Sequence, residues 1–224
     1  DKVPYMSNVF EEKFNQKLIA LIADNGYNLG TNFEWKTVAD LKGQTLAGAG
    51  LNLKWLEFAG AVPVQGSLPE AYTGMQTGVY NGWIMFPSGW VNFKLYEVGK
   101  YYTEVGFGAI TWHGLTVNKA RWAKLPKEVQ DIMLQVAREY EARTGTVNKE
   151  NYPKQIEQLK ANGAVIKSVP DSVRVEWATS LKGWPQDKAA ELDKQGLPAS
   201  QVLKLALEEA EKLGHKWPVR YPIK

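Results

Sequence analysis

The sequence predicts an α/β fold in which short buried strands alternate with helices. Short apolar runs bounded by glycine, proline or polar turns recur along the first half of the chain, as buried strands do. Helical patterns, with apolar positions three or four residues apart, separate these runs. A long helical pattern then begins at Leu125-Pro126. This alternation favours a doubly wound sheet over a barrel.

The segment 66–98 carries the strongest local signals, and it reads as helix, strand, helix. Ser67 and Glu70 form a capping-box pattern at the start of the first helix. Tyr80–Phe86 has the length and apolar character of a buried strand, and Ser88 is placed to cap a second helix. Aromatic rings gather at the carboxyl end of this strand, where ligands bind in open α/β sheets. These rings belong to Trp83, Phe86 and Trp90.

The remaining elements follow the same two patterns. Asp24–Asn28 reads as a polar turn placed at a ligand or a hinge. Further strands are expected at 18–23, 44–48, 61–64, 100–105, 109–117 and 164–169. Further helices are expected at 4–17, up to Ala59, from Leu125 to about Leu159, and near 171–181, 185–194 and 198–213.

Composition excludes several classes of function. Apolar residues make up 44% of the 224 residues and charged residues 23%, as in ordinary globular proteins. A net charge of +3 with scattered lysines does not suggest nucleic acid. No apolar run reaches membrane-spanning length, so we do not expect the chain itself to span a membrane. The absence of cysteine excludes a thiol nucleophile, a disulfide framework and a zinc ribbon.

No catalytic or metal-binding constellation is recognisable, and we expect no cofactor. His113 and His215 are the only histidines and are too far apart to suggest a metal pair. A Gly-x-Ser-x-Gly elbow is missing, and the carboxylates fall on helix faces. The glycine-rich turn Gly48-Ala49-Gly50 lacks nucleotide-binding spacing, although it suits a carboxylate at the following helix start.

A ligand cleft is the better explanation of the many aromatic residues, because ring surfaces exclude water around a small solute. The alternative for each ring is plain core packing. Asn28 and Asn52 are candidates to hydrogen-bond the ligand. Trp55 is a candidate to line the opposite wall of the cleft. The candidate ligand-binding residues are Asn28, Asn52, Trp55, Trp83, Phe86 and Trp90.

Several motifs in one order resemble the substrate-binding proteins of TRAP transporters, the DctP family. The signature-like motifs are Glu70-Ala71-Tyr72, Met75-Gln76-Thr77-Gly78-Val79, Asn81-Gly82 and Leu95-Tyr96-Glu97-Val98. Asp40–Gly43, Gly60–Val64 and stretches within 117–130 match the family upstream and downstream. The resemblance runs from about Ala20 to Val165.

The resemblance implies a two-lobe, periplasmic-binding-protein-like (type II) fold with mixed sheets and a long hinge-spanning helix. It also implies a periplasmic receptor that captures a small organic acid by lobe closure and delivers it to membrane subunits without chemistry. Residues 1–26 would be the remainder of lobe 1, 27–117 lobe 2 with the crossing strands, and 118–224 the long helix and C-terminal helices returning to lobe 1. The N-terminal part of the family is expected to be absent before Asp1.

Departures from the family pattern bear on the ligand. Ala47 and Asn28 stand where most members have arginines that hold a substrate carboxylate, and Asn81 replaces an aspartate. The run 83–85 is Trp-Ile-Met in place of acidic and amide residues. An arginine binds a carboxylate through two N–H groups at once, so its replacement changes which ligands can be held. We therefore expect an aromatic or otherwise apolar monocarboxylate rather than a dicarboxylate or a sialic-acid-type substrate.

Two alternatives stay open at this stage. The first is an enzyme acting on a small organic acid with the same architecture, which would need a polar, pKa-perturbed cluster in the cleft. The second is an interaction module without a ligand, which a missing first lobe makes conceivable.

Overall fold

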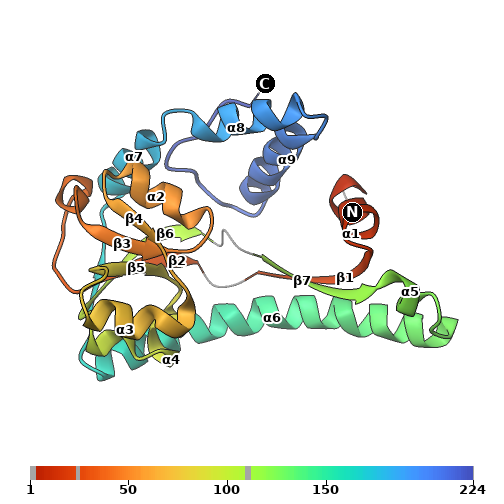
Figure 1. Ribbon diagram of the computed structural model, residues 1–224, viewed down its shortest axis with the longest axis horizontal. Helices are drawn as coiled ribbons and strands as arrows, with labels where there is room; N and C mark the ends of the chain where they lie inside the picture. Colours follow the sequence, from red (N-terminus) through yellow and green to blue (C-terminus); the bar gives the residue numbers. More distant parts are fainter. Residues whose placement is uncertain (1–3, 24–25, 109–111, 224) are drawn as a thin grey trace.

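A computed structural model of the chain describes residues 4–23, 26–108 and 112–223, and its strands fall into two sheets (Figure 1). A six-stranded mixed sheet is the centre of an α/β body. A two-stranded ribbon lies along a long helix, and together they project from that body as an arm (Figure 1). The body holds the candidate site, and the arm extends away from it.

The strands of the main sheet are β2 (Tyr27–Thr31), β3 (Thr45–Gly48), β4 (Val62–Gln65), β5 (Gly82–Met85), β6 (Tyr101–Gly108) and β8 (Val165–Ser168). They lie in the order β4-β3-β5-β2-β6-β8. β3 is parallel to β4 and β5, and β6 is parallel to β8, whereas β2 is antiparallel to both of its neighbours. The carboxyl ends of β3, β4, β5 and β6 therefore share one edge of the sheet with the start of β2.

The strand β2 differs from the sequence expectation. We predict a polar turn over Asp24–Asn28, but Tyr27 and Asn28 begin this central strand, while Asp24 and Asn25 lie outside the described residues. Asn28 and Gly30 have low intrinsic strand propensity. The strand forms because it is buried along its whole length and is hydrogen-bonded on both sides, so tertiary context overrides local preference.

Helices cover both faces of the main sheet (Figure 1). The helices of the body, including 3-10 turns (η), are η1 (Val38–Leu41), α2 (Asn52–Phe58), η2 (Leu68–Glu70), α3 (Ala71–Gln76), α4 (Pro87–Asn92), η3 (Leu95–Glu97) and α7 (Asp171–Ser180). The others are α1 (Pro4–Lys13), α5 (Lys119–Trp122), α6 (Lys127–Ala161), α8 (Trp184–Asp193) and α9 (Ala199–Lys212). The described helices include none that combines the length and apolar character needed to cross a bilayer.

Three helix starts or ends differ from the sequence expectation. The first helix ends at Lys13 rather than residue 17, because Asn15 takes the left-handed conformation (φ 52°) and β1 (Gln16–Ala23) then begins. The Ser67 hydroxyl donates to the Glu70 carboxylate (2.7 Å) instead of capping the helix backbone. The second helix of the central segment starts at Pro87, a residue suited to a first helical turn, and not after a Ser88 cap.

The arm consists of β1, β7 (Trp112–Asn118) and α6. β1 and β7 form an antiparallel ribbon, and β1 packs on α6. α6 runs for 35 residues and passes Gly145 and Pro153 without ending. An apolar hollow of about 440 Å³ lies between the ribbon and α6.

The sheet divides the core into two clusters, one on each face. Successive side chains along a strand point to opposite faces, so neighbouring residues belong to different clusters. On β5, Ile84 packs with α2 and α7, whereas Trp83 and Met85 pack with α3, α4 and the end of α6. On β3, Leu46 and Ala47 divide in the same way.

Candidate ligand-binding site

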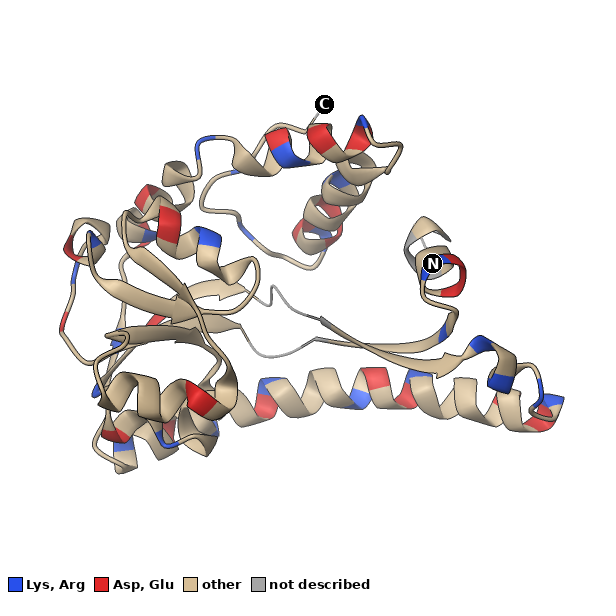
Figure 2. Cartoon of the chain, viewed as in Figure 1, with Lys and Arg blue, Asp and Glu red and all other residues tan. Residues whose placement is uncertain are grey.

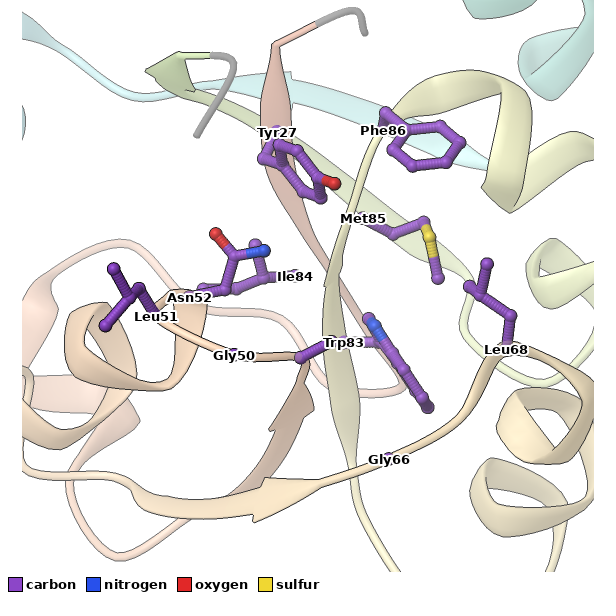
Figure 3. A pocket seen from close by; sticks show the side chains of 11 residues that line it. Tyr27, Gly50, Leu51, Asn52, Gly66, Leu68, Trp83, Ile84, Met85 and Phe86 are labelled. Atoms are coloured by element: carbon purple, nitrogen blue, oxygen red, sulfur yellow. The ribbon is translucent and has the colours of Figure 1, made fainter. Parts of the chain in front are cut away.

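A pocket of about 330 Å³ opens at the carboxyl ends of β3, β4 and β5, beside the start of β2 (Figure 3). In open α/β sheets, ligands bind at this edge, in a crevice between the loops that leave the strands. The pocket is lined by Tyr27, Ala49, Gly50, Leu51, Asn52, Gly66, Leu68, Trp83, Ile84, Met85 and Phe86. Three of the predicted site residues, Asn52, Trp83 and Phe86, are therefore brought together.

The turn from β3 into α2 is held in shape by its own hydrogen bonds. The N–H of Gly50 (φ +56°) donates to Oε1 of Gln65 at the end of β4 (3.1 Å). The N–H groups of Asn52 and Leu53 donate to the carbonyls of Ala49 and Gly50. These three N–H groups already donate to protein acceptors, and α2 is a short helix of seven residues. The structure therefore does not support the carboxylate predicted at this helix start.

Trp83 forms one wall of the pocket and is only 2% exposed. Its ring lies so close to Gly66 that a Cβ there would be 2.4 Å from Cη2 of the indole. The rings of Tyr80 and Trp83 pack edge to face, with their centroids 5.3 Å apart. Ala47 pairs with Trp83 across the parallel β3–β5 ladder and belongs to the same buried cluster. A small residue thus lies beside a large indole ring.

Phe86 and Tyr27 form the upper part of the pocket in Figure 3. Their rings meet edge to face, with centroids 5.4 Å apart. Phe86 directly follows β5 and is half-buried, whereas Tyr27 begins β2 and is buried. The two strands are antiparallel neighbours, which is why their opposite ends bring these rings together.

Asn52 supplies the polar side chain of an otherwise largely apolar wall. It is 4% exposed, at the first position of α2. Its Oδ1 is buried and finds no hydrogen-bond partner within the part of the chain that the structure describes. Figure 3 shows the amide beside Ile84, on the other side of β5 from the Trp83 indole. Buried polar atoms without a partner are rare in native proteins and require an explanation.

Asn28 does not line the pocket and has its polar atoms engaged by protein. Its Nδ2 donates to the hydroxyl of Tyr152 (2.9 Å) and, at 3.4 Å, to that of Tyr102, while its Oδ1 accepts from the N–H of Gly106 (2.9 Å). The Tyr152 hydroxyl in turn donates to Glu104 (2.8 Å). Burial, more than any other cause, raises the pKa of both tyrosines, so both hydroxyls stay protonated at neutral pH. This network ties α6 to β2 and β6.

Trp90 and Trp55 also lie outside the pocket lining. Trp90 is fully buried, with its ring against Gly30 and 5.7 Å from that of Tyr102. Trp55 is half-buried on α2, and its ring packs 5.3 Å from that of Phe107. In this structure both side chains pack against other protein groups, Trp90 wholly inside the core.

Charge is absent from the immediate site. The residues described as lining the pocket include no lysine, arginine, aspartate or glutamate. Figure 2 shows both signs of charge spread over the helices, with the strands around the pocket mostly free of them. Within the described ranges no group of three or more His, Cys, Asp or Glu side chains is arranged to hold a metal ion. The site can enclose an apolar body and offer a few hydrogen bonds.

Sequence reasoning misses several lining residues, in part because it predicts a turn where β2 begins. Tyr27 is the clearest case, since it is part of that turn. Leu68 and Gly66 follow β4 directly, so the rule that ligands bind at carboxyl ends of parallel strands was the available signal.

An apolar pocket at the strand ends of an open α/β sheet is typical of small-molecule-binding proteins, and comparisons with known proteins give the family. A profile described as "Bacterial extracellular solute-binding protein, family 7" (DctP) matches residues 4–191. The chain therefore belongs to this family, and the resemblance found in the sequence is confirmed. The family is one of solute-binding proteins, so the enzyme alternative is not supported.

Three relatives illustrate the likeness. The C4-dicarboxylate-binding periplasmic protein DctP of Vibrio cholerae is 30% identical over 154 residues, which are 65% of this chain and 45% of the relative. A TRAP periplasmic solute-binding protein from Desulfovibrio salexigens, solved with orotic acid, has a TM-score of 0.81 at 24% identity, covering 93% of this chain and 67% of the other. DctP7 of Bordetella pertussis, which binds pyroglutamic acid, has a TM-score of 0.74 at 21% identity over 79% and 58% of the two chains.

These likenesses confirm the expected fold class, an α/β periplasmic-binding-protein-like fold with a mixed sheet and a long helix, here α6. The chain spans 31% and 45% of the length of the curated relatives it matches.

Proposed function

We propose that this chain is the ligand-binding part of an extracytoplasmic receptor of a TRAP transporter. It captures a small organic acid in the periplasm by lobe closure and delivers it to membrane subunits. The observation that carries the proposal is the pocket at the carboxyl ends of β3, β4 and β5, walled by Trp83 and Phe86. Family membership supports the same role.

The favoured ligand is an aromatic or otherwise apolar monocarboxylate. The position of one family arginine is Ala47, beside the Trp83 ring, and that of the other is Asn28, whose polar atoms are bonded to protein. An unpaired buried carboxylate is costly. The ligand's ring therefore lies against Trp83, and its carboxylate points to the open side of the pocket. The relative with orotic acid binds a flat ring bearing one carboxylate, in keeping with this class.

The proposed division of the chain follows from the same role. Residues 1–26 belong to the first lobe and 27–117 to the second lobe with its crossing strands, and 118–224 begin with the long helix and return to the first lobe. α6 is the hinge component. Asn52, Trp83 and Phe86 contact the ligand, whereas Asn28, Trp55 and Trp90 support the surrounding structure.

A thermal-shift panel tests this proposal. The chain is heated with indoleacetate, phenylacetate and cyclohexanecarboxylate, and separately with succinate and malate. We expect stabilisation by members of the first group, because they bind the folded state alone. Stabilisation by the diacids alone contradicts the ligand class, and a chain stabilised by none of these acids contradicts the receptor function. Native mass spectrometry of freshly purified, undialysed protein identifies any retained solute.

A further inference from the structure

The buried amide of Asn52 is the feature of the pocket that its packing does not explain. Oδ1 has no hydrogen-bond partner among the described residues, and the side chain is 4% exposed. Its neighbours in the lining include Leu51 and Ile84, which are apolar. A leucine has nearly the same shape as asparagine and would fill the site without leaving a polar atom unpaired. An unsatisfied buried acceptor costs stability, so this oxygen does not stabilise the bare pocket.

We propose that Asn52 determines ligand specificity, and that its Oδ1 accepts a hydrogen bond from an N–H or O–H group carried by the ligand's ring. This inference rests on the proposed function, and it deepens the ligand class. A carboxylate is only an acceptor at neutral pH, so it cannot satisfy Oδ1. The donor must therefore belong to the body of the ligand, as in a ring nitrogen bearing hydrogen or a phenol.

The position of Asn52 agrees with this role. It lines the same pocket as Trp83, but the two side chains lie on opposite sides of β5, so a ligand that borders the indole reaches the amide by extending past the end of this strand (Figure 3). The turn that carries Asn52 is fixed by the bond from Gly50 to Gln65, which holds the amide in place. A site built around a hydrogen bond rejects an analogue that lacks the donor, because the buried polar atom is then left unpaired.

Matched ligands and variants test the inference on the intact 224-residue chain. Indoleacetate carries a ring N–H, whereas its N-methyl derivative and naphthylacetate have similar rings without a donor. Affinities are measured by calorimetry for the wild type, Asn52→Leu and the control Asn92→Leu, which changes an exposed asparagine outside the pocket lining. We expect the wild type and the control to prefer indoleacetate by about fivefold or more. Asn52→Leu should lose that preference.

A second measurement separates a binding role from a structural one. Unliganded Asn52→Leu should melt at the same temperature as the wild type or higher, because it removes an unpaired buried acceptor. A clearly lower melting temperature would show that the amide holds the fold and would overturn the inference. Equal affinity of the wild type for all three ligands would also overturn it, leaving the proposed function intact. If none of the three binds, the proposed ligand class is contradicted, and this inference with it.

Discussion

Adding one methyl group at Gly66 should damage ligand binding more than it damages the fold. A Cβ at this position would lie 2.4 Å from Cη2 of Trp83 and 2.7 Å from Cζ3, about an ångström inside the 3.4 Å at which ordinary contact begins. The indole must therefore move. It borders the pocket of about 330 Å³, so it can shift into the space that the ligand's ring would occupy.

The size of both effects depends on the space into which the Trp83 indole can move. Because the indole has open space beside it, we expect Gly66→Ala to cost ~1 kcal/mol of stability, the low end for an overpacked site. Binding of an aromatic acid should fall about tenfold, or ~1.4 kcal/mol, because the shifted ring narrows the pocket. Urea unfolding gives the first quantity, and titration with indoleacetate gives the second.

Gly30→Ala is the matched control, because it presses on an indole that has no such space. Its Cβ would lie 2.3 Å from two ring atoms of Trp90, which is fully buried and also packs closely on Gly99. We expect a loss of ~3 kcal/mol in stability, with affinity per folded molecule changed less than about twofold. Unchanged binding in Gly66→Ala together with lost binding in Gly30→Ala would refute the assignment of Trp83 to the pocket wall.

Three further predictions concern the surrounding structure. Tyr152→Phe should destabilise the chain by ~1–2 kcal/mol, because it removes the hydrogen bonds that join α6 to the sheet. The pKa of Tyr152 is raised above its usual 10.0, chiefly by burial, so wild-type stability falls as the pH rises past that value. The difference in unfolding free energy between the wild type and Tyr152→Phe should therefore be smaller at about pH 11 than at about pH 8, as measured by urea unfolding. Asp40→Asn should destabilise the chain at neutral pH, because backbone N–H groups hold the pKa of this carboxyl below its usual 3.8. The difference in unfolding free energy between the wild type and Asp40→Asn should disappear in denaturant titrations as the pH falls below the lowered pKa of Asp40. Val136→Glu, at a side chain 55% exposed, should change stability by less than ~0.5 kcal/mol, whereas Ala137→Glu, at a residue 3% exposed, should cost more than ~3 kcal/mol in the same assay.

Most of the secondary structure could be predicted because its signals are local. The predicted strand Tyr80–Phe86 is apolar and is followed by a proline, and residues 82–85 of it form β5. The long helix keeps its apolar spacing through Gly145 and Pro153. β2 could not be predicted in this way. Its residues Asn28 and Gly30 favour turns, and only pairing with β5 and β6 makes them a strand.

The candidate site was predictable in part for a related reason. Trp83 and Trp90 are both rings close to one strand end, and nothing in their local sequence distinguishes them. The difference lies in non-local contacts, since Trp90 fills a gap left by Gly30, whereas Trp83 lies along Gly66 at the edge of the pocket. Asn52 could be proposed from its place after a glycine turn, but its missing partner is visible only in three dimensions.

Nuclear magnetic resonance of the indole N–H groups tests the central claim most directly. The chain has nine tryptophans, and the signals of Trp83 and Trp90 can be assigned from the substitutions Trp83→Phe and Trp90→Phe. On titration with indoleacetate, the Trp83 signal should shift until it saturates. The Trp90 signal should shift no more than the signals of tryptophans far from the pocket. A Trp83 signal that does not move while another tryptophan responds would contradict the account.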